Sequence, residues 1–362
     1  SVGLTFVLWL PGVWKSGFRR LFRGDLAFPI LLIGLAALSL IPTTNRLRTV
    51  AEIVQWAEYV IVAYLLFRSG LEMPAVRPWM VRLFAAASAL VIGLGVAHYT
   101  MAGLDDFKVR STFGNANVLG GFLALSLPVL FGLMLDASCW KWRIGLLLAI
   151  LAGFAVVLSG GAFLALIAAL AVMAAARGWK AFAAYALALL AVVFLLMPLL
   201  PRDNLEGLWQ SVRLFDDDGV VTRRYAEWQA AMEMIREHPL AGVGAGCYQD
   251  RIGAFYGMIP VVGGVPSPPD SQNLFLVLGA SIGLPGLAAF GGLILLALAQ
   301  AARRAVRAAP AAKNGLALGV FGSLLAFLVA SLWSPLLVRG IGVPLAFVLA
   351  LAAARPAGPS QN

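Results

Sequence analysis

Charged residues are scarce in this chain. Asp, Glu, Lys and Arg make up 12% of its 362 residues, whereas 61% of the residues are hydrophobic. The mean hydropathy is accordingly high, at +0.89. A chain of this length and composition has too little polar surface to fold as a water-soluble globule. The shortage of charge therefore excludes a soluble globular protein and indicates an integral membrane protein.

Cysteine and histidine are equally rare, with two of each. Cys139 and Cys247 are separated by several expected spans and lack the spacing of metal ligands, so we expect neither a structural disulfide nor a metal site there. His98 and His238 cannot form a metal cluster by themselves. The acidic run 216–218 fits a solvated turn better than a specific cation site. We therefore expect no metal and no cofactor.

Long basic runs are also missing. The net charge is +10, which by itself is compatible with nucleic-acid binding. In a membrane protein, however, the same excess arises from loops on the cytoplasmic side. We therefore expect membrane lipid, and no nucleic acid, as a partner.

Apolar segments rich in Leu, Ala and Gly fill most of the chain and fit α-helical spans, since a helix satisfies its own backbone groups in hydrocarbon. The fold class is therefore predicted to be all-α, a polytopic integral membrane helical bundle of about ten transmembrane helices. The expected spans are 26–42, 50–67, 80–100, 116–135, 142–158, 161–176, 180–200, 272–300, 315–333 and 337–354. Three parts follow: an N-terminal transmembrane bundle (1–200), a polar loop (201–271) and C-terminal transmembrane helices (272–362). Because the chain begins with Ser1 rather than methionine, no signal peptide can be read from it.

The distribution of Lys and Arg predicts the orientation. When the spans alternate, 16 of the 27 basic residues fall on one side, 5 fall on short loops of the other side, and 6 lie in the long loop. Basic residues in short loops favour the cytoplasm, whereas long loops are largely exempt from this rule. We therefore expect both termini in the cytoplasm and the loop 201–271 in the periplasm or outside the cell.

The long loop holds 10 of the 17 acidic residues and one amphipathic helix. Thr222 is a plausible N-cap and Pro239 a stop. We expect an apolar face and an opposite polar face on a helix that lies on the membrane or caps the bundle. The apolar face would carry Tyr225, Trp228, Met232 and Ile235, and the polar face Arg223, Glu227, Ala230 and Met234. The glycines that follow, Gly242, Gly244 and Gly246, lack a preceding strand and fit a tight turn with close backbone packing.

Arginines on the predicted outer side are the best lead to function. Arg110, Arg223, Arg224 and Arg339 all lie there, and Asn115 and Asn117 stand at the mouth of a span. A guanidinium group keeps its charge and donates paired hydrogen bonds, so such a group of arginines suits a phosphate or diphosphate. For each arginine alone, a lipid headgroup contact or a surface ion pair is the alternative.

Three ordered segments resemble signatures of the O-antigen ligase and polymerase superfamily. They read RSTFGNANVLGG from Arg110, RYAEWQAAMEMIREHPLAGVGAGCY from Arg224 and SQNLFLVLGASIGLPGL from Ser271. The most specific part is R-x-x-x-W followed by H-P-L-x-G-x-G-x-G-x-[FY]. The resemblance implies a multi-span glycosyltransferase that uses neither a nucleotide sugar nor a metal and acts at the outer face of the bacterial inner membrane. Its donor is a polyprenyl diphosphate-linked glycan, and its acceptor is a hydroxyl on another glycan or on a lipid-linked molecule.

By position, the resemblance makes Arg110 and Arg224 ligands of the diphosphate and matches Asn273 to the asparagine of the family. Trp228 and His238 are motif residues and are candidates for substrate binding on the same basis. Arg223 and Arg339 join the candidates because of their predicted side.

Two positions depart from the family pattern. Gly160 stands where an arginine is common, so Arg223 or Arg339 would have to replace that arginine. Gln272 stands where the family has a histidine that assists the acceptor hydroxyl; a glutamine orients a hydroxyl but cannot take its proton. Asp270 is the candidate replacement base, with an N-cap role as its alternative. Glu233 and Glu237 are weaker candidates.

The sequence thus favours a polymerase-like or ligase-like transfer with Asp270 and Gln272 as candidate catalytic residues. A transporter for a small anion such as bicarbonate, and an inactive scaffold of polysaccharide assembly, remain as alternatives. A transport path needs polar groups near the middle of the membrane, where the spans offer mainly Glu52 and Glu58. Both glutamates either lie near the end of the second span or pair with Arg46 and Arg48.

Overall fold

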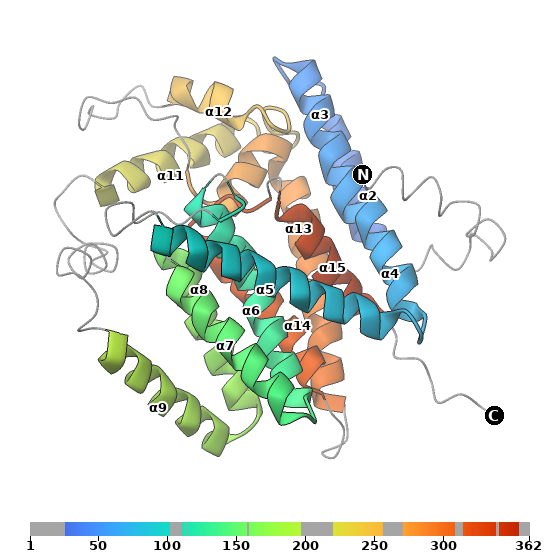
Figure 1. Ribbon diagram of the computed structural model, residues 1–362. Coiled ribbons are helices and arrows are strands. Elements are labelled where there is room, and N and C mark those ends of the chain that lie inside the picture. The colour runs from blue at the N-terminus through green and yellow to red at the C-terminus, as the bar shows by residue number, and fades with distance from the viewer. Residues whose placement is uncertain are drawn as a thin grey trace.

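A computed structural model describes residues 26–101, 111–113, 115–157, 159–196, 220–255, 271–307, 314–337 and 340–354. These residues form helices joined by turns and contain no strand (Figure 1). Their helices are α2 (Ala27–Leu38), α3 (Arg46–Ala57), η3 (Glu58–Ala63), α4 (Tyr64–Glu72), α5 (Arg77–Met101), α6 (Ala116–Asp136), α7 (Trp140–Val156), α8 (Gly160–Ala176), α9 (Trp179–Leu196), α11 (Val220–Glu237), α12 (Tyr248–Arg251), η5 (Ile252–Phe255), α13 (Leu274–Arg307), α14 (Gly315–Ala330) and α15 (Gly342–Ala353).

The all-α membrane fold is confirmed, because each of the ten expected spans contains a helix. Four stretches of the described chain are long and apolar enough to cross a membrane: Arg46–Glu72, Arg77–His98, Ala116–Asp136 and Leu274–Val306. The first of them joins α3 and α4 through η3, which is one turn of π-helix. The division at residues 200 and 271 into three parts stays a prediction.

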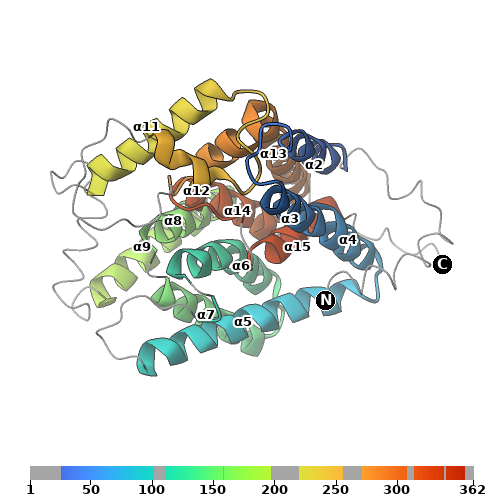
Figure 2. The same cartoon turned by 90° about the horizontal axis from the view of Figure 1, so that it is seen from above.

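Helices α6 and α14 form the centre of the bundle, between α5 and α7 on one side and α13 on the other (Figure 2). Glycines bring their backbones together. A Cβ atom added at Gly319 would lie 2.7 Å from the carbonyl oxygen of Pro128, and one added at Gly132 would collide with the carbonyl oxygen of Gly315. Small residues allow this approach where lipid supplies no hydrophobic driving force between helices. The centre is therefore closed by backbone contact.

One end of the bundle, the basic end, comprises residues 137–143 and 177–180 with Arg303 and Arg304. The Asp136 carboxylate accepts hydrogen bonds from the first amides of α14, at 2.8 Å each. Arg304 donates to two carbonyls at the C-terminus of α15. Trp79, Trp140, Trp142 and Trp179 are exposed on the first turns of α5, α7 and α9. Exposed tryptophans beside basic residues are typical of a membrane interface.

The opposite end, the loop end, comprises residues 39–45, 238–255, 271–273 and 331–337 with the first turns of α6 and α8. Several contacts join these segments. The Ala245 amide donates to the Ser39 hydroxyl at 3.0 Å, and the Leu274 amide donates to the Ser331 carbonyl at 2.9 Å. Figure 1 shows α11 and α12 across this end. All the motif residues in the described chain lie here or on the helices that start or end here.

Helix α13 is broken at Gly283, although a single span 272–300 was expected. Gly283 has φ 74° and ψ 172°. Pro285 has no amide hydrogen and cannot make the helical hydrogen bond to the Ser281 carbonyl. The Ser281 carbonyl therefore needs another donor. The glycine-rich loop satisfies the break: Val243 donates to Ala280 and Gly244 donates to Ser281, at 2.9 and 3.0 Å. Residues 274–282 therefore belong to the loop end, and only the part after Gly283 crosses the bundle.

The break in α13 also explains why the segment 242–246 is rich in glycine. The Leu284 amide donates to the Pro239 carbonyl at 2.8 Å. Gly242, Gly244 and Gly246 have φ 65°, 112° and 73°, values that L-residues with side chains rarely adopt. A Cβ atom at Gly242 would collide with the backbone of Ser281. The expected tight turn with close backbone packing is confirmed.

The face of the amphipathic helix that was predicted to be polar carries its buried residues. Helix α11 begins at Val220, so Thr222 is inside it and is not its N-cap. The buried residues of α11 are Glu227, Ala230, Ala231 and Met234, whereas Met232 is exposed. They pack with Tyr248, Ile252 and the first turns of α13. Small side chains let α11 approach α13 closely, so the face with Ala230 and Ala231 packs on the bundle although the predicted apolar face carries larger side chains.

Candidate functional site

Gln272 stands at the junction of three segments of the loop end. On one side, the Trp228 indole nitrogen donates to the Ser271 carbonyl at 2.9 Å. On the other, the Leu274 amide donates to the Ser331 carbonyl. Gln272 itself is half-buried and has φ 50°, in the left-handed region. A residue other than glycine holds that conformation only where its surroundings impose it, and such residues cluster at functional sites.

Asn273 and Asn115 have N-capping roles. The Asn273 side-chain oxygen accepts hydrogen bonds from the Phe275 and Leu276 amides at 3.0 and 3.2 Å, and only 7% of the residue is exposed. The Asn115 side-chain oxygen accepts from the Asn117 amide at 2.8 Å. Asn273, and not Asp270, is therefore the N-cap of α13. Substrate binding by these asparagines stays a prediction.

Three helices begin beside one another at this site. A Cβ atom at Gly120, in the second turn of α6, would lie 2.8 Å from the Ala162 side chain on the first turn of α8. A Cβ atom at Gly161 would lie 2.6 Å from the Trp333 side chain. Trp333 belongs to the same turn as Ser331, which holds the start of α13. The first turns of α6, α8 and α13 therefore lie beside residues 331–337. The positive ends of the three helix dipoles favour an anion there.

The arginine candidates mostly lie outside the described residues. Arg110, Arg339 and Asp270 are not described, and for Arg223 and Arg224 only the backbone within α11 is. The residues that flank two of them are in contact, however. A Cβ atom at Gly340, next to Arg339, would lie 2.8 Å from the Phe113 ring, three residues beyond Arg110. The structure therefore brings Phe113 and Gly340 together, while Arg110 and Arg339 themselves lie outside the described residues.

Gly160 is exposed at the first position of α8. Gly161, the next residue, is covered by Trp333, because a Cβ atom added there would lie 2.6 Å from the Trp333 side chain. The position where the family has an arginine thus lies at the site but offers no charge.

His238 lies apart from Gln272. It follows the last turn of α11, beside the break of α13, where its carbonyl accepts from the Gly242 amide. Ten residues of helix separate it from Trp228, which is roughly 15 Å along the axis. The structure therefore brings Trp228, Gln272 and Asn273 together, with the start of α6 nearby, and leaves His238 at the glycine-rich loop.

Glu227, which the sequence pattern placed on the polar face with the option of pairing with Arg223, was not predicted to be buried. Glu233 pairs with Arg236 at 2.9 Å on the exposed side of α11, and Glu237 is exposed as well. Glu227 is 4% exposed. A sequence feature that indicates its burial is the pair Ala230 and Ala231, which lie three and four positions after Glu227 and so on the same face of the helix. Among the described residues, no group of three His, Cys, Asp or Glu is placed to hold a metal ion.

The charged groups expected on a transport path are placed as follows. Arg48 pairs with Asp250 at 2.6 Å at the loop end. Glu52 accepts a hydrogen bond from the Trp56 indole, and Glu58 is half-buried in η3. In the described part of the chain, Glu227 and Arg68 are the buried charged side chains, and Arg68 pairs with Glu72 one turn further along α4. These groups form no continuous polar line between the two ends.

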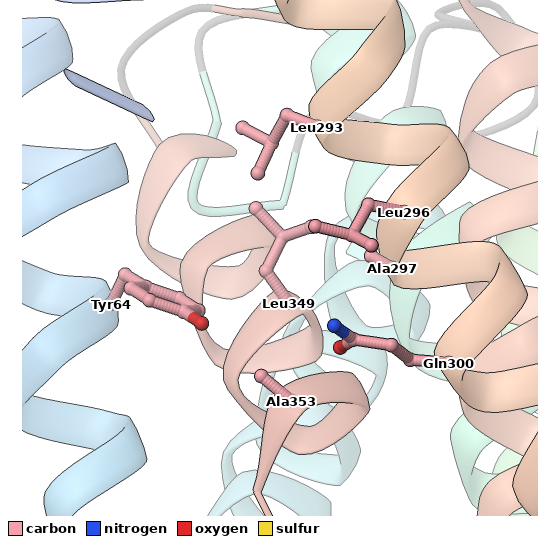
Figure 3. Close-up of a pocket in the computed structure, with 7 residues that line it drawn as sticks. All are labelled: Tyr64, Leu293, Leu296, Ala297, Gln300, Leu349 and Ala353. Atoms are coloured by element: carbon pink, nitrogen blue, oxygen red, sulfur yellow. The ribbon is translucent and has the colours of Figure 1, made fainter. Parts of the chain in front are cut away.

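A pocket between α4, α13 and α15 is too small for a substrate. Its volume is about 10 Å³, which is room for a single water molecule. Figure 3 shows Tyr64 and Gln300 facing it from opposite sides, with Leu349 and Ala353 between them. Ala353 is held by Arg304, so the pocket belongs to the half of the bundle nearer the basic end.

The comparisons with known proteins agree with the motifs. Residues 144–291 match the family described as O-Antigen ligase. The match spans α7 to α9, α11, α12 and the first part of α13, and so includes the second and third signatures. It confirms the resemblance to the O-antigen ligase and polymerase superfamily. A comparison with curated proteins gave no match.

Proposed function

Because residues 144–291 match the O-antigen ligase family, we propose that this O-antigen ligase- or polymerase-like membrane enzyme transfers a glycan from a polyprenyl diphosphate carrier. The acceptor is a hydroxyl on another glycan or on a lipid-linked molecule. The loop end faces the periplasm at the inner membrane, and the termini are cytoplasmic. The absence of the histidine at Gln272 favours a polymerase-like reaction over transfer to a lipid A core.

The observation that carries this proposal is the meeting of all three signatures around one anion-favouring end. Trp228 of the second signature binds the backbone of Ser271 in the third. The helix that follows Asn115, in the first signature, begins beside α8 and residues 331–337. The dipoles of the three helix starts suit the diphosphate, which is the charged group that the carrier brings.

In the proposed reaction, an acceptor oxygen forms a bond to the anomeric carbon while the bond from that carbon to the diphosphate oxygen breaks, with inversion. Arg110 and Arg224, with Arg223 or Arg339, stabilise the negative charge that develops on the departing diphosphate, which is where electrostatic help is largest. The Gln272 amide orients the acceptor hydroxyl. The hydroxyl proton passes to a carboxylate, for which Asp270 is the candidate, or to the departing diphosphate.

The test uses purified protein with a polyprenyl diphosphate-linked glycan, with and without candidate acceptors, and measures released polyprenyl diphosphate. Arg110→Ala and Arg224→Ala are expected to lower turnover by about 100-fold or more, because each removes a group that stabilises the transition state. Arg236→Ala is the matched control: this arginine lies on the same helix as Arg224 but is exposed and paired with Glu233.

Gly160→Arg sharpens the test. It restores the charge that the family carries at an exposed position, and it is expected to lower the KM for the donor. Two results together would overturn the glycosyltransferase function: no turnover with any acceptor, and unaltered binding of the carrier lipid in Arg110→Ala and Arg224→Ala.

A further inference from the structure

Glu227 is a carboxylate in an otherwise apolar contact. It shares its buried face with Ala230, Ala231 and Met234, which pack on α12 and the start of α13. Taking an ionised carboxylate out of water costs several kcal/mol unless a cation or several hydrogen-bond donors compensate it. The small and apolar residues beside Glu227 already pack α11 on the bundle, so the charge of Glu227 adds no packing energy. Glu227 therefore has a role beyond packing, which an opposite charge beside it would explain.

The register of α11 limits the choice of partner. Residues three and four positions apart are neighbours on a helix surface. Positions 223 and 224 lie four and three residues before Glu227, and α11 is continuous from Val220. They therefore extend the same face toward the start of the helix, and both are arginines. Elsewhere on the described helix, the basic residue is Arg236, which pairs with Glu233 on the exposed side.

The face of α11 that packs on the bundle thus has two parts. Its second half is apolar and fixes the helix to α13, where a Cβ atom at Gly279 would lie 3.0 Å from the Ile235 side chain. Its first half carries Glu227 and the two arginine positions. Trp228, adjacent to Glu227, holds Ser271. The charged half therefore begins next to Gln272, and backbone positions 223 and 224 lie further from the apolar half along the helix.

We propose that Glu227 is a positioning residue for the diphosphate site: its buried carboxylate orients the arginines of the first turns of α11. The idea rests on the proposed function, since it assigns those arginines to the diphosphate. An arginine held by a buried partner has lost its rotamer freedom before the ligand arrives, so less is lost on binding. A positioned cation also stabilises the transition state without reorganising during the reaction.

The decisive variant is Glu227→Gln, which keeps the shape and hydrogen-bonding capacity of the side chain and removes its charge. We expect the KM for polyprenyl diphosphate-linked glycan to rise, and kcat/KM to fall by about 10- to 100-fold, the range that misplaced binding groups produce. Glu227→Asp, which keeps the charge, should recover part of the loss. Arg236→Gln is the control, since it also removes one charge from the same helix, at an exposed position. Thermal unfolding in detergent checks that each variant folds.

A double-mutant cycle separates positioning from other roles. Glu227→Gln is combined with Arg224→Gln and, separately, with Arg223→Gln. In the variant that lacks the arginine oriented by Glu227, adding Glu227→Gln should change KM and kcat/KM very little. Independent, multiplicative effects with both arginines would overturn the proposal. So would an unchanged KM and kcat in Glu227→Gln. A fall in kcat alone, with loss of the acidic limb of the pH profile, would make Glu227 a general base instead.

Binding of polyprenyl diphosphate, measured without turnover, keeps the two proposals distinct. If the wild type binds this lipid but transfers no glycan, and Glu227→Gln weakens the binding, the reaction is wrong and the positioning role stands. If Glu227→Gln does not fold, Glu227→Asp decides: the shortened side chain should weaken binding, and wild-type affinity in that variant would overturn the proposal.

Discussion

The α6–α14 contact and the loop end are both buried, but different interactions hold them together. Between α6 and α14, the backbones touch through glycines at 132, 315 and 319, and both segments stay helical across the contact although Pro128 lies inside α6. At the loop end, the helix α13 is interrupted, and the amides and carbonyls freed by the break are paired with a loop about 40 residues away in sequence.

The difference shows where this fold accepts irregular backbone. Within hydrocarbon, an unpaired amide or carbonyl costs several kcal/mol, so continuous helices fill the centre. At the loop end, every break must be satisfied by another segment, and this requirement brings three distant signatures together. The centre supplies rigidity, and the interruptions supply the helix starts and the strained Gln272 that a site needs. Four substitutions test this division.

The largest effect is expected from Gly319→Val, at the centre. Its side chain would meet the backbone of Pro128 and Val129, which cannot move without separating the helices. Overpacking of this kind costs about 3 kcal/mol, so the midpoint of thermal unfolding in detergent should fall strongly and activity should fall with it. Gly93→Val is the control, because no atom lies within 4 Å of a Cβ atom there. Equal stability of the two variants would contradict the close-packed centre.

Gly283→Ala should come next. The added Cβ atom would collide with the Leu240 carbonyl, and φ 74° is unfavourable for alanine. We expect a loss of about 2 kcal/mol, with a larger loss of turnover, because the break aligns α11 with the start of α13. Gly291→Ala, in the same helix and with open space around it, should leave both measurements nearly unchanged. Retention of turnover in Gly283→Ala would separate the break from the site.

Asn273→Ala removes the side-chain oxygen that caps α13. Loss of such a cap costs about 1 kcal/mol, which should appear as a moderate shift of the unfolding midpoint. Asn273→Asp retains an acceptor and should restore most of the stability. If Asn273→Asp regains stability but not turnover, the amide nitrogen of Asn273 serves the substrate; if both return together, capping is its whole role.

The smallest effect is expected from Arg48→Ala. Arg48 and Asp250 join α3 to α12, but their side chains are 44% and 41% exposed. Exposed ion pairs contribute about 0 to 1 kcal/mol, so stability should change little and less still at high salt. A loss comparable to that of Gly283→Ala would mean that the ion pair, and not the backbone pairing, holds the loop end closed.

Sequence patterns predicted most of the fold, because a helix in hydrocarbon must satisfy its own backbone. Each apolar segment from 26–42 to 337–354 contains a helix, and the alternation of loops between two ends follows from their count. The break at Gly283 was missed, since the apolar pattern runs through it. The signal was present in Gly283 and Pro285, which together prevent a regular helix.

The site was predicted in part. The motif residues Trp228, Gln272 and Asn273 do lie together, and the chain beside Arg110 approaches the chain beside Arg339. The buried residues of α11 come from the face that was predicted to be polar, and Glu227 on that face was not among the candidate site residues. Hydrophobicity ranked Trp228 and Met232 above Ala230 and Ala231, whereas close helix contact selects small residues.

The sequence by itself determined that this chain forms membrane helices, how they alternate, and which motifs it shares with the O-antigen ligase family, because these properties depend on local composition and order. Only the tertiary structure decided which face of α11 is buried, which residue caps α13, and which amides donate hydrogen bonds to the carbonyls of Ala280 and Ser281. Those outcomes depend on backbone groups and small side chains from segments distant in sequence. Their pairing is settled by proximity, which no local pattern records.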